Sequence, residues 1–215
     1  MNARSTIASP GTAAASLATV GLVFGVCYWL SNRLTHVRAD VGTAVFAWER
    51  VIPFVEWTVV PYLSIVLFFI ASFFMPQARD DLRVHAARLL ALLAVALACY
   101  AVFPLRFTFE RPETTGLTGV LFDVINAIDQ PYNRAPSLHI GVLVVLWARF
   151  STLVDGAARL AVQGWFMLIG VSVLTTYQHH VVDVPAGFAA GCLCVWALRA
   201  PFSPLRPRAA ASAWA

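Results

Sequence analysis

The chain contains 215 residues, of which 60% are hydrophobic and only 12% are charged, and its mean hydropathy is +0.74. These values exclude an ordinary soluble protein and leave room for one helical bundle in a membrane, without a separate soluble domain. The net charge of +4 comes from 15 arginines and 11 acidic residues, and the arginines form no run interleaved with aromatic side chains. We therefore expect the lipid bilayer as a partner and no nucleic acid.

Six apolar segments approach or exceed the length that a membrane-spanning helix needs, about 18–20 residues. In chain order they cover residues 15–30, 59–75, 86–103, 138–153, 160–177 and 181–198. No convincing cleavage site follows the first segment, so we expect a retained helix and not a removed signal peptide. The predicted fold class is all-α: a single polytopic membrane domain over residues 1–215 with about six transmembrane helices.

Two connections between these segments are longer than a bundle needs. Residues 31–58 mix charged and aromatic side chains, which fits either a segment in the headgroup plane beside a lipid access route or an aromatic belt around ordinary helix ends. Residues 104–136 form a long extramembrane loop between the third and fourth helices, and loops of that length are usually functional or disordered. Within this loop, residues 120–128 have the pattern of a short amphipathic helix, which argues against disorder.

The arginines predict the orientation in the membrane. An even number of spans places both termini on one side, and nine arginines fall there: Arg4, Arg79, Arg83, Arg88, Arg149, Arg159, Arg199, Arg206 and Arg208. Six fall on the other side: Arg33, Arg38, Arg50, Arg106, Arg111 and Arg134. Because positive charge is retained on the cytoplasmic side, this excess predicts cytoplasmic termini. In a bacterium the protein would lie in the inner membrane with the 104–136 loop at the periplasmic face.

Three ionisable residues at the ends of predicted spans are the strongest functional signal. His139 lies at the start of the fourth span, His179 follows the fifth, and Asp183 lies at the start of the sixth. Six spans place all three on the non-cytoplasmic side, together with the 104–136 loop. Ionisable groups at membrane depth are costly and usually functional. We therefore expect an active site at that side of the bundle.

A histidine held by a carboxylate can carry out phosphoryl transfer without a metal. If one helix continues through His179 and Asp183, the two side chains project about 40° apart and can hydrogen-bond. The neutral imidazole of His179, held in one tautomer by Asp183, would attack phosphorus and form a phosphohistidine. His139 would protonate the leaving group and then activate the incoming water or alcohol. We expect no metal and no cofactor, because the site has one carboxylate and no clustered metal ligands.

Positive charge for the phosphoryl oxygens is available on the same side. Arg106 and Arg111 supply forked donors that suit phosphate. Ser137, with the backbone N–H groups at the start of a helix, would add further donors. Arg134 fits either a phosphate contact or a contact to a lipid headgroup. These four residues are the substrate-binding candidates.

The motifs resemble those of a known family. Arg111-Pro112, then Pro136-Ser137-Leu138-His139, then His179-x-x-x-Asp183 are similar to the three signature motifs of the type 2 phosphatidic acid phosphatase superfamily. The similarity covers residues 104–191 and has the same order. It implies a six-helix membrane core that uses no metal and acts on lipid phosphates or isoprenoid diphosphates, or as a lipid phosphotransferase.

The resemblance also implies a role for each residue. His179 corresponds to the nucleophile, Asp183 to the group that orients it, and His139 to the acid and base. Arg111 and Ser137 correspond to phosphate contacts.

This chain departs from the family pattern at three places. The first motif usually begins with a lysine where Pro104 stands, and Arg106 is the candidate to replace it. The third motif usually has an arginine where Val173 stands, and the second has a glycine where Leu138 stands. The Ser-Leu-His sequence, with the doubled His179-His180, looks more like the inositol-phosphorylceramide-synthase-like branch. Transfer to an alcohol therefore stays open beside hydrolysis.

Two other classes of protein fit parts of the pattern. A catalytically silent membrane protein, kept as a binder or scaffold, would explain the departures, but it need not retain His139, His179 and Asp183 together. A transporter could use the same residues as a proton relay, but it should show two related halves, and the sequence has no internal repeat. A phosphatase of phospholipid metabolism fits best. The sequence does not specify the lipid, and we infer no required protein partner.

Overall fold

The computed structural model describes residues 6–199. Within that range all regular structure is helical, and the only β-interactions are isolated bridges. The elements are, in order, α1 (Pro10–His36), η1 (Ala47–Val51), η2 (Glu56–Thr58), α2 (Val59–Phe74), α3 (Arg79–Val102), α4 (Gly116–Ile128), α5 (Leu138–Phe150), α6 (Gly156–Thr175) and α7 (Asp183–Ala197). The all-α prediction is confirmed. Arg4, Arg206 and Arg208, which entered the arginine count, lie outside the described residues.

Four stretches of helix are long and apolar enough to cross a membrane. They are α1, the stretch Glu56–Phe74 that contains α2, α3, and α6. Large apolar side chains on their surfaces are exposed, among them Leu22, Leu67 and Met167. Exposed apolar surface of this extent is typical of helices that face lipid. The structure therefore supports the predicted membrane protein.

The remaining two predicted spans are shorter than expected. α5 and α7 are apolar but contain only 13 and 15 residues, a rise of roughly 20 Å each at 1.5 Å per residue. That is less than the hydrocarbon thickness of about 30 Å. The helices are short because Ser137 caps the start of α5, where its Oγ accepts from the N–H of Ile140 at 3.3 Å, and because residues 176–182 form a turn before α7. Four of the six predicted spans are thus long enough to cross a membrane, and the other two, α5 and α7, are shorter.

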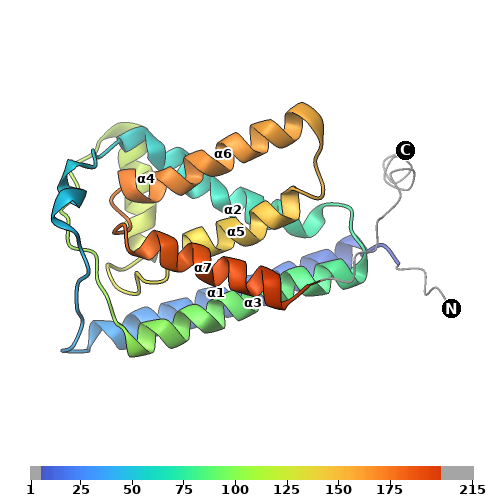
Figure 1. Ribbon diagram of the computed structural model, residues 1–215, viewed down its shortest axis with the longest axis horizontal. Helices are drawn as coiled ribbons and strands as arrows, with labels where there is room; N and C mark the ends of the chain where they lie inside the picture. The colour runs from blue at the N-terminus through green and yellow to red at the C-terminus, as the bar shows by residue number, and fades with distance from the viewer. Residues whose placement is uncertain (1–5, 200–215) are drawn as a thin grey trace.

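The contacts between helices place α5 in the middle of the bundle. It contacts α2, α3, α6 and α7, while α1 packs on α3 and α2 packs on α6. In Figure 1, α4 and the start of α7 lie at one end of the bundle, and the α2–α3 and α5–α6 connections lie at the opposite end. The start of α5, the end of α6 and the start of α7 therefore share the end that carries α4.

Two loop regions cover this end of the bundle. The helix predicted over residues 120–128 is present as α4, and it buries Phe122 and Ile125. The segment after α1 contains η1 and η2, in which the side chain of Glu49 is buried while Trp48 and Trp57 are exposed. The carboxylate of Glu49 therefore lies inside the protein, while the two tryptophan side chains of this segment lie at its surface.

Helices α5 and α7 approach each other closely through glycines. A Cβ atom on Gly187 would lie 2.4 Å from the backbone oxygen of Ser137, and one on Gly191 would lie 2.8 Å from the backbone oxygen of Gly141. The N–H of Ser137 also donates to the backbone oxygen of Asp183 at 3.1 Å. Because backbone atoms cannot move aside as a flexible side chain can, only glycine allows this approach. The approach holds Ser137 and Asp183 next to each other.

We predict that Gly187→Ala destabilises the protein by about 1–3 kcal/mol, since the added methyl group would overlap a fixed backbone oxygen. The matched control is Gly164→Ala in α6, because a Cβ there meets no atom within 4 Å. Thermal unfolding in detergent should show a lower midpoint for Gly187→Ala and an unchanged or higher midpoint for Gly164→Ala. Equal midpoints for the two variants would contradict the close approach.

Candidate active site

His179 lies in the turn between α6 and α7. The N–H groups of Gln178 and His179 both donate to the backbone oxygen of Val173, at 3.2 and 3.1 Å, and Tyr177 adopts a left-handed conformation with φ of 53°. α7 begins only at Asp183, so the helix through both His179 and Asp183 on which we based their contact is absent. The contact itself is present, because the turn brings the His179 ring back to the first residue of α7.

The hydrogen bonds of His179 define which ring nitrogen is free to react. Its Nδ1 lies 3.2 Å from Oδ2 of Asp183, a carboxylate that is 1% exposed. An ionised carboxylate only accepts hydrogen bonds, so we infer that Nδ1 carries the proton and that Nε2 carries the lone pair. Nε2 faces Oγ of Ser137 at 3.1 Å, and this oxygen already accepts from the N–H of Ile140. The Ser137 hydroxyl is therefore free to donate to Nε2.

His139 lies in the first turn of α5, two residues after Ser137. Its ring stacks on that of Tyr62 in α2, with the centroids 4.1 Å apart and the planes 15° from parallel. Its Nε2 is buried, and no hydrogen-bond partner for it is found among the described residues. Stacking on Tyr62 fixes the orientation of the ring, and an Nε2 without a partner among the described residues is available for proton exchange.

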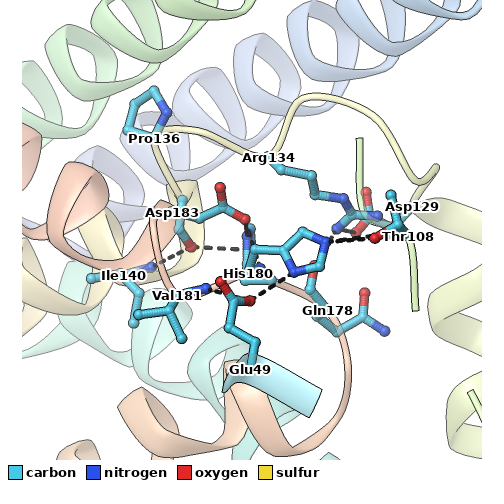
Figure 2. Close-up of polar contacts among 12 residues, drawn as sticks. Glu49, Thr108, Asp129, Arg134, Pro136, Ile140, Gln178, His180, Val181 and Asp183 are labelled. Carbon is cyan, nitrogen blue, oxygen red and sulfur yellow. Dashed lines mark hydrogen bonds and ion pairs between the residues drawn. The ribbon is translucent and has the colours of Figure 1, made fainter. Parts of the chain in front are cut away.

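Arg134 is buried and is held mainly by the protein itself. Its Nη1 donates to Oδ2 of Asp129 at 3.1 Å and to the backbone oxygen of Gln178 at 2.9 Å, and its Nη2 donates to the backbone oxygen of Gln130 at 2.5 Å. Although burial disfavours the charged guanidinium, the Asp129 carboxylate raises the pKa of Arg134 above its ordinary value. Arg134 thus ties the loop after α4 to the backbone beside His179 (Figure 2).

An open cleft of about 280 Å³ lies next to this turn. Its lining comprises Phe107, Phe109, Arg111, Ile125, Asn126, Asp129, Pro131, Arg134, Tyr177 and Gln178. Arg111 lies over the ring of Phe122, with its Cζ 4.6 Å from the centroid, and donates through Nε to Thr176 and through Nη1 to Asn126. Its Nη2 makes no hydrogen bond with the described residues, so it is available to an anion in the cleft.

The structure brings most of the predicted site residues together. Ser137, His179 and Asp183 are in direct contact, His139 lies in the same first turn of α5, and Arg111 and Arg134 line the neighbouring cleft. Arg106 is different. Its side chain is exposed and is not part of the cleft lining, and its backbone N–H donates to Gly42.

Three residues of this region were not predicted. Glu49 accepts a hydrogen bond from Nδ1 of His180 at 2.8 Å, Tyr62 stacks on His139, and Asp129 pairs with Arg134. The sequence carried a signal for Glu49, because an acidic residue within an aromatic and apolar stretch calls for the same explanation as Asp183. It carried none for Tyr62 or Asp129, whose contacts depend on how the chain returns on itself.

Comparisons of the chain with protein-family models, with curated proteins and with solved structures found no match. The assignment of roles therefore depends on the geometry and on the motifs of this chain. Among residues 6–199, no group of three or more His, Cys, Asp or Glu side chains is arranged to hold a metal ion.

The Arg134–Asp129 pair generates a prediction about stability. Asp129 also accepts from the hydroxyl of Tyr28 at 2.6 Å, so Asp129→Ala would leave a buried guanidinium and a partly buried hydroxyl without this acceptor. We expect a loss of about 1–3 kcal/mol, less than for a fully buried pair, because the Asp129 side chain is 16% exposed and Arg134 keeps two backbone acceptors. Asp123→Ala, at an exposed position of α4, is the control and should be neutral. Similar unfolding midpoints for the two variants would show that the pair does not hold Arg134.

Proposed function

We propose that this protein is a metal-independent membrane phosphatase that hydrolyses a lipid phosphate or diphosphate through a phosphohistidine intermediate. The observation that carries the proposal is the chain of contacts from Asp183 through Nδ1 of His179 to its Nε2, which faces Ser137. A histidine oriented in this way by a buried carboxylate has the lone pair on the outer nitrogen that a nucleophile needs. The arginine-lined cleft beside it supplies the positive charge.

The reaction would proceed in two steps. In the first, Nε2 of His179 attacks phosphorus, the bond from phosphorus to the lipid oxygen breaks, and protonated His139 gives its proton to that oxygen. In the second, His139 takes a proton from water, the water oxygen attacks phosphorus, and the N–P bond breaks to release inorganic phosphate. Asp183 stabilises the positive charge on the His179 ring during both steps, while Ser137 and Arg111 donate to the phosphoryl oxygens.

We further propose that α5 and α7 complete a bundle of six crossings. Both helices are too short to span the hydrocarbon alone, and the turn that follows α6 would make up the missing depth. Irregular backbone at membrane depth is tolerated only where protein covers it, and four residues of this turn are buried: Thr176, Gln178, His179 and His180. The reacting phosphoryl group would then lie just inside the headgroup region, with the lipid chain between the helices.

A second candidate is a lipid phosphotransferase, in which an alcohol replaces water in the second step. The cleft favours this alternative, because its aromatic and polar lining, including Phe107, Asn126 and Tyr177, leaves room for a small polyol beside the turn that carries His179. Water and an alcohol would use the same residues. A product analysis that follows both free phosphate and new lipid species distinguishes the two reactions.

We predict that His179→Ala abolishes turnover and the acid-labile phosphoenzyme, because no other described side chain hydrogen-bonds to the side chains of both Asp183 and Ser137. His139→Ala should slow turnover by roughly 100-fold or more, the usual contribution of a general acid, while a substrate with a good leaving group still phosphorylates the protein. The control is His36→Ala, an exposed histidine at the end of α1. Activity at the wild-type level in His179→Ala would remove this mechanism.

A second prediction concerns metal ions and inhibition. Activity of the purified protein should survive EDTA, because protein side chains, with Asp183 among them, supply all the charge stabilisation that the mechanism uses. Vanadate should inhibit, since it can adopt the trigonal-bipyramidal geometry of the phosphoryl group in transfer. Loss of activity on chelation, with recovery on addition of Mg²⁺, would mean that the roles are misassigned.

A third prediction concerns orientation. A reporter fused after Ala215, which lies outside the described residues, should report the cytoplasm. A cysteine introduced as Leu117→Cys in α4, at a side chain 75% exposed, should be labelled from outside intact cells. The wild-type protein, with its four native cysteines, is the control. Labelling that occurs only after the cells are permeabilised would reverse the orientation and make the substrate a lipid of the cytoplasmic leaflet.

A further inference from the structure

Glu49 is the most completely bonded buried carboxylate of the described chain outside the proposed reaction. It lies in η1, is 1% exposed, and accepts three hydrogen bonds. Its Oε2 accepts from Nδ1 of His180 at 2.8 Å and from the N–H of Val181 at 3.2 Å, and its Oε1 accepts from the N–H of Phe46 at 2.9 Å. Figure 2 shows Glu49 below the His180 ring, with Val181 beside it. A loop that precedes α2 therefore holds the turn that precedes α7.

The hydrogen bonds of His180 fix its tautomer. Its Nε2 lies 3.3 Å from the backbone nitrogen of Thr108 and 3.1 Å from the Thr108 hydroxyl. A backbone N–H can only donate, so Nε2 carries no proton and Nδ1–H points to Glu49. The ring also stacks on Phe107 at 4.4 Å and meets Phe109 edge to face at 4.9 Å. His180 is thus a neutral, immobilised ring and not a reacting group.

The backbone of His180 connects this arrangement to the proposed nucleophile. Its N–H donates at 2.9 Å to Oδ2 of Asp183, the same oxygen that accepts from Nδ1 of His179. Movement of the His180 peptide would therefore change the position of the carboxylate oxygen that orients His179. Glu49 restrains that peptide from both sides, through the His180 ring and through the N–H of Val181.

We propose that Glu49 is a positioning residue for the phosphoryl transfer assigned above: acting through His180, it holds the peptide that aligns Asp183 with His179. The expected effect of Glu49 on the reaction rate rests on the proposed function, whereas its expected effect on the position of the His179 ring does not. Removal of the Glu49 carboxylate would leave three donors without an acceptor and lower the stability of the fold. The effect of Glu49 on geometry is therefore measured as a rate per folded molecule. A displacement of the reacting groups by about 1 Å can cost roughly 100-fold in rate.

The test uses Glu49→Gln, which keeps the shape of the side chain but leaves one acceptor oxygen for three donors, so at least one donor faces an NH₂ group. Glu49→Ala removes all three acceptor bonds. The matched control is Glu56→Gln, an acidic residue of the same loop whose carboxylate accepts from the hydroxyl of Thr118. All variants are studied as the full chain in detergent, and rates are expressed per folded molecule from thermal unfolding curves.

We expect Glu49→Gln to lower kcat by roughly 10-fold and Glu49→Ala by roughly 100-fold, with KM within about twofold of wild type, because the substrate contacts are unchanged. In an Asp183→Asn background, Glu49→Gln should cause little further loss, because both changes act on the same alignment. Additive losses in the double variant, or an unchanged kcat in Glu49→Gln, would overturn the proposal while the phosphatase assignment stands.

A second measurement does not depend on turnover. Diethylpyrocarbonate modifies unprotonated imidazole nitrogens, and mass spectrometry can follow its reaction at His179 alone. We expect the modification rate of His179 to rise several-fold in Glu49→Gln and to stay at the wild-type value in Glu56→Gln, because a loosened turn exposes Nε2. If the wild-type protein hydrolyses no lipid phosphate, the function fails, and this rate still tests Glu49. Equal rates in the two variants would overturn the positioning role.

Discussion

One carboxylate oxygen organises the candidate site. Oδ2 of Asp183 accepts from the ring of His179 and from the backbone of His180, and these two bonds fix the turn that follows α6. The carboxylate can occupy this place only because α7 approaches α5 at Gly187, where a side chain would overlap the backbone of Ser137. The close approach of Gly187 to the backbone of Ser137 thus helps to determine which nitrogen of His179 faces the Ser137 hydroxyl.

The other carboxylates near the site, buried Glu49 and half-buried Asp129, are also satisfied by several donors. A carboxylate in an apolar surrounding is tolerated only when donors satisfy it. Glu49 receives three donors, and Asp129 receives the Tyr28 hydroxyl and the Arg134 guanidinium. Each of these carboxylates receives donors from segments far from it in the chain. The loops over the α4 end therefore form one connected polar layer, and the turn that holds His179 is part of it.

The sequence predicted the elements that depend on local composition and on order. The apolar segments, the short helix in the long loop and the placement of His139, His179 and Asp183 at one end followed from hydropathy and from the alternation of helix direction. We expected His179 and Asp183 to be in contact because we predicted one helix through both residues. The contact is present, but the predicted helix is wrong, because a turn joins the two residues. Spacing alone cannot distinguish these two ways of bringing residues four apart together.

Contacts between distant segments could not be predicted from the sequence. The stacking of Tyr62 on His139 and the bonds of Glu49 to the turn depend on how α2 and η1 pack against the ends of α5 and α6. Arg106 is the opposite case, because it was predicted as a site residue and does not line the cleft. Its forked donors and its place near the missing motif lysine made it a candidate ligand, yet its side chain is exposed and does not line the cleft. Sequence proximity indicated the right loop but not which arginine faces inward.

The central claim is that Asp183 holds His179 so that its Nε2 is the nucleophile. The most direct test is to trap the phosphorylated protein during turnover of a lipid phosphate, digest it under alkaline conditions and determine by mass spectrometry and phosphorus NMR which atom carries the phosphoryl group. The account predicts a single phosphohistidine, at His179, with phosphorus bonded to Nε2. Phosphorus on Nδ1 of His179, or on His139 or His180, would contradict it.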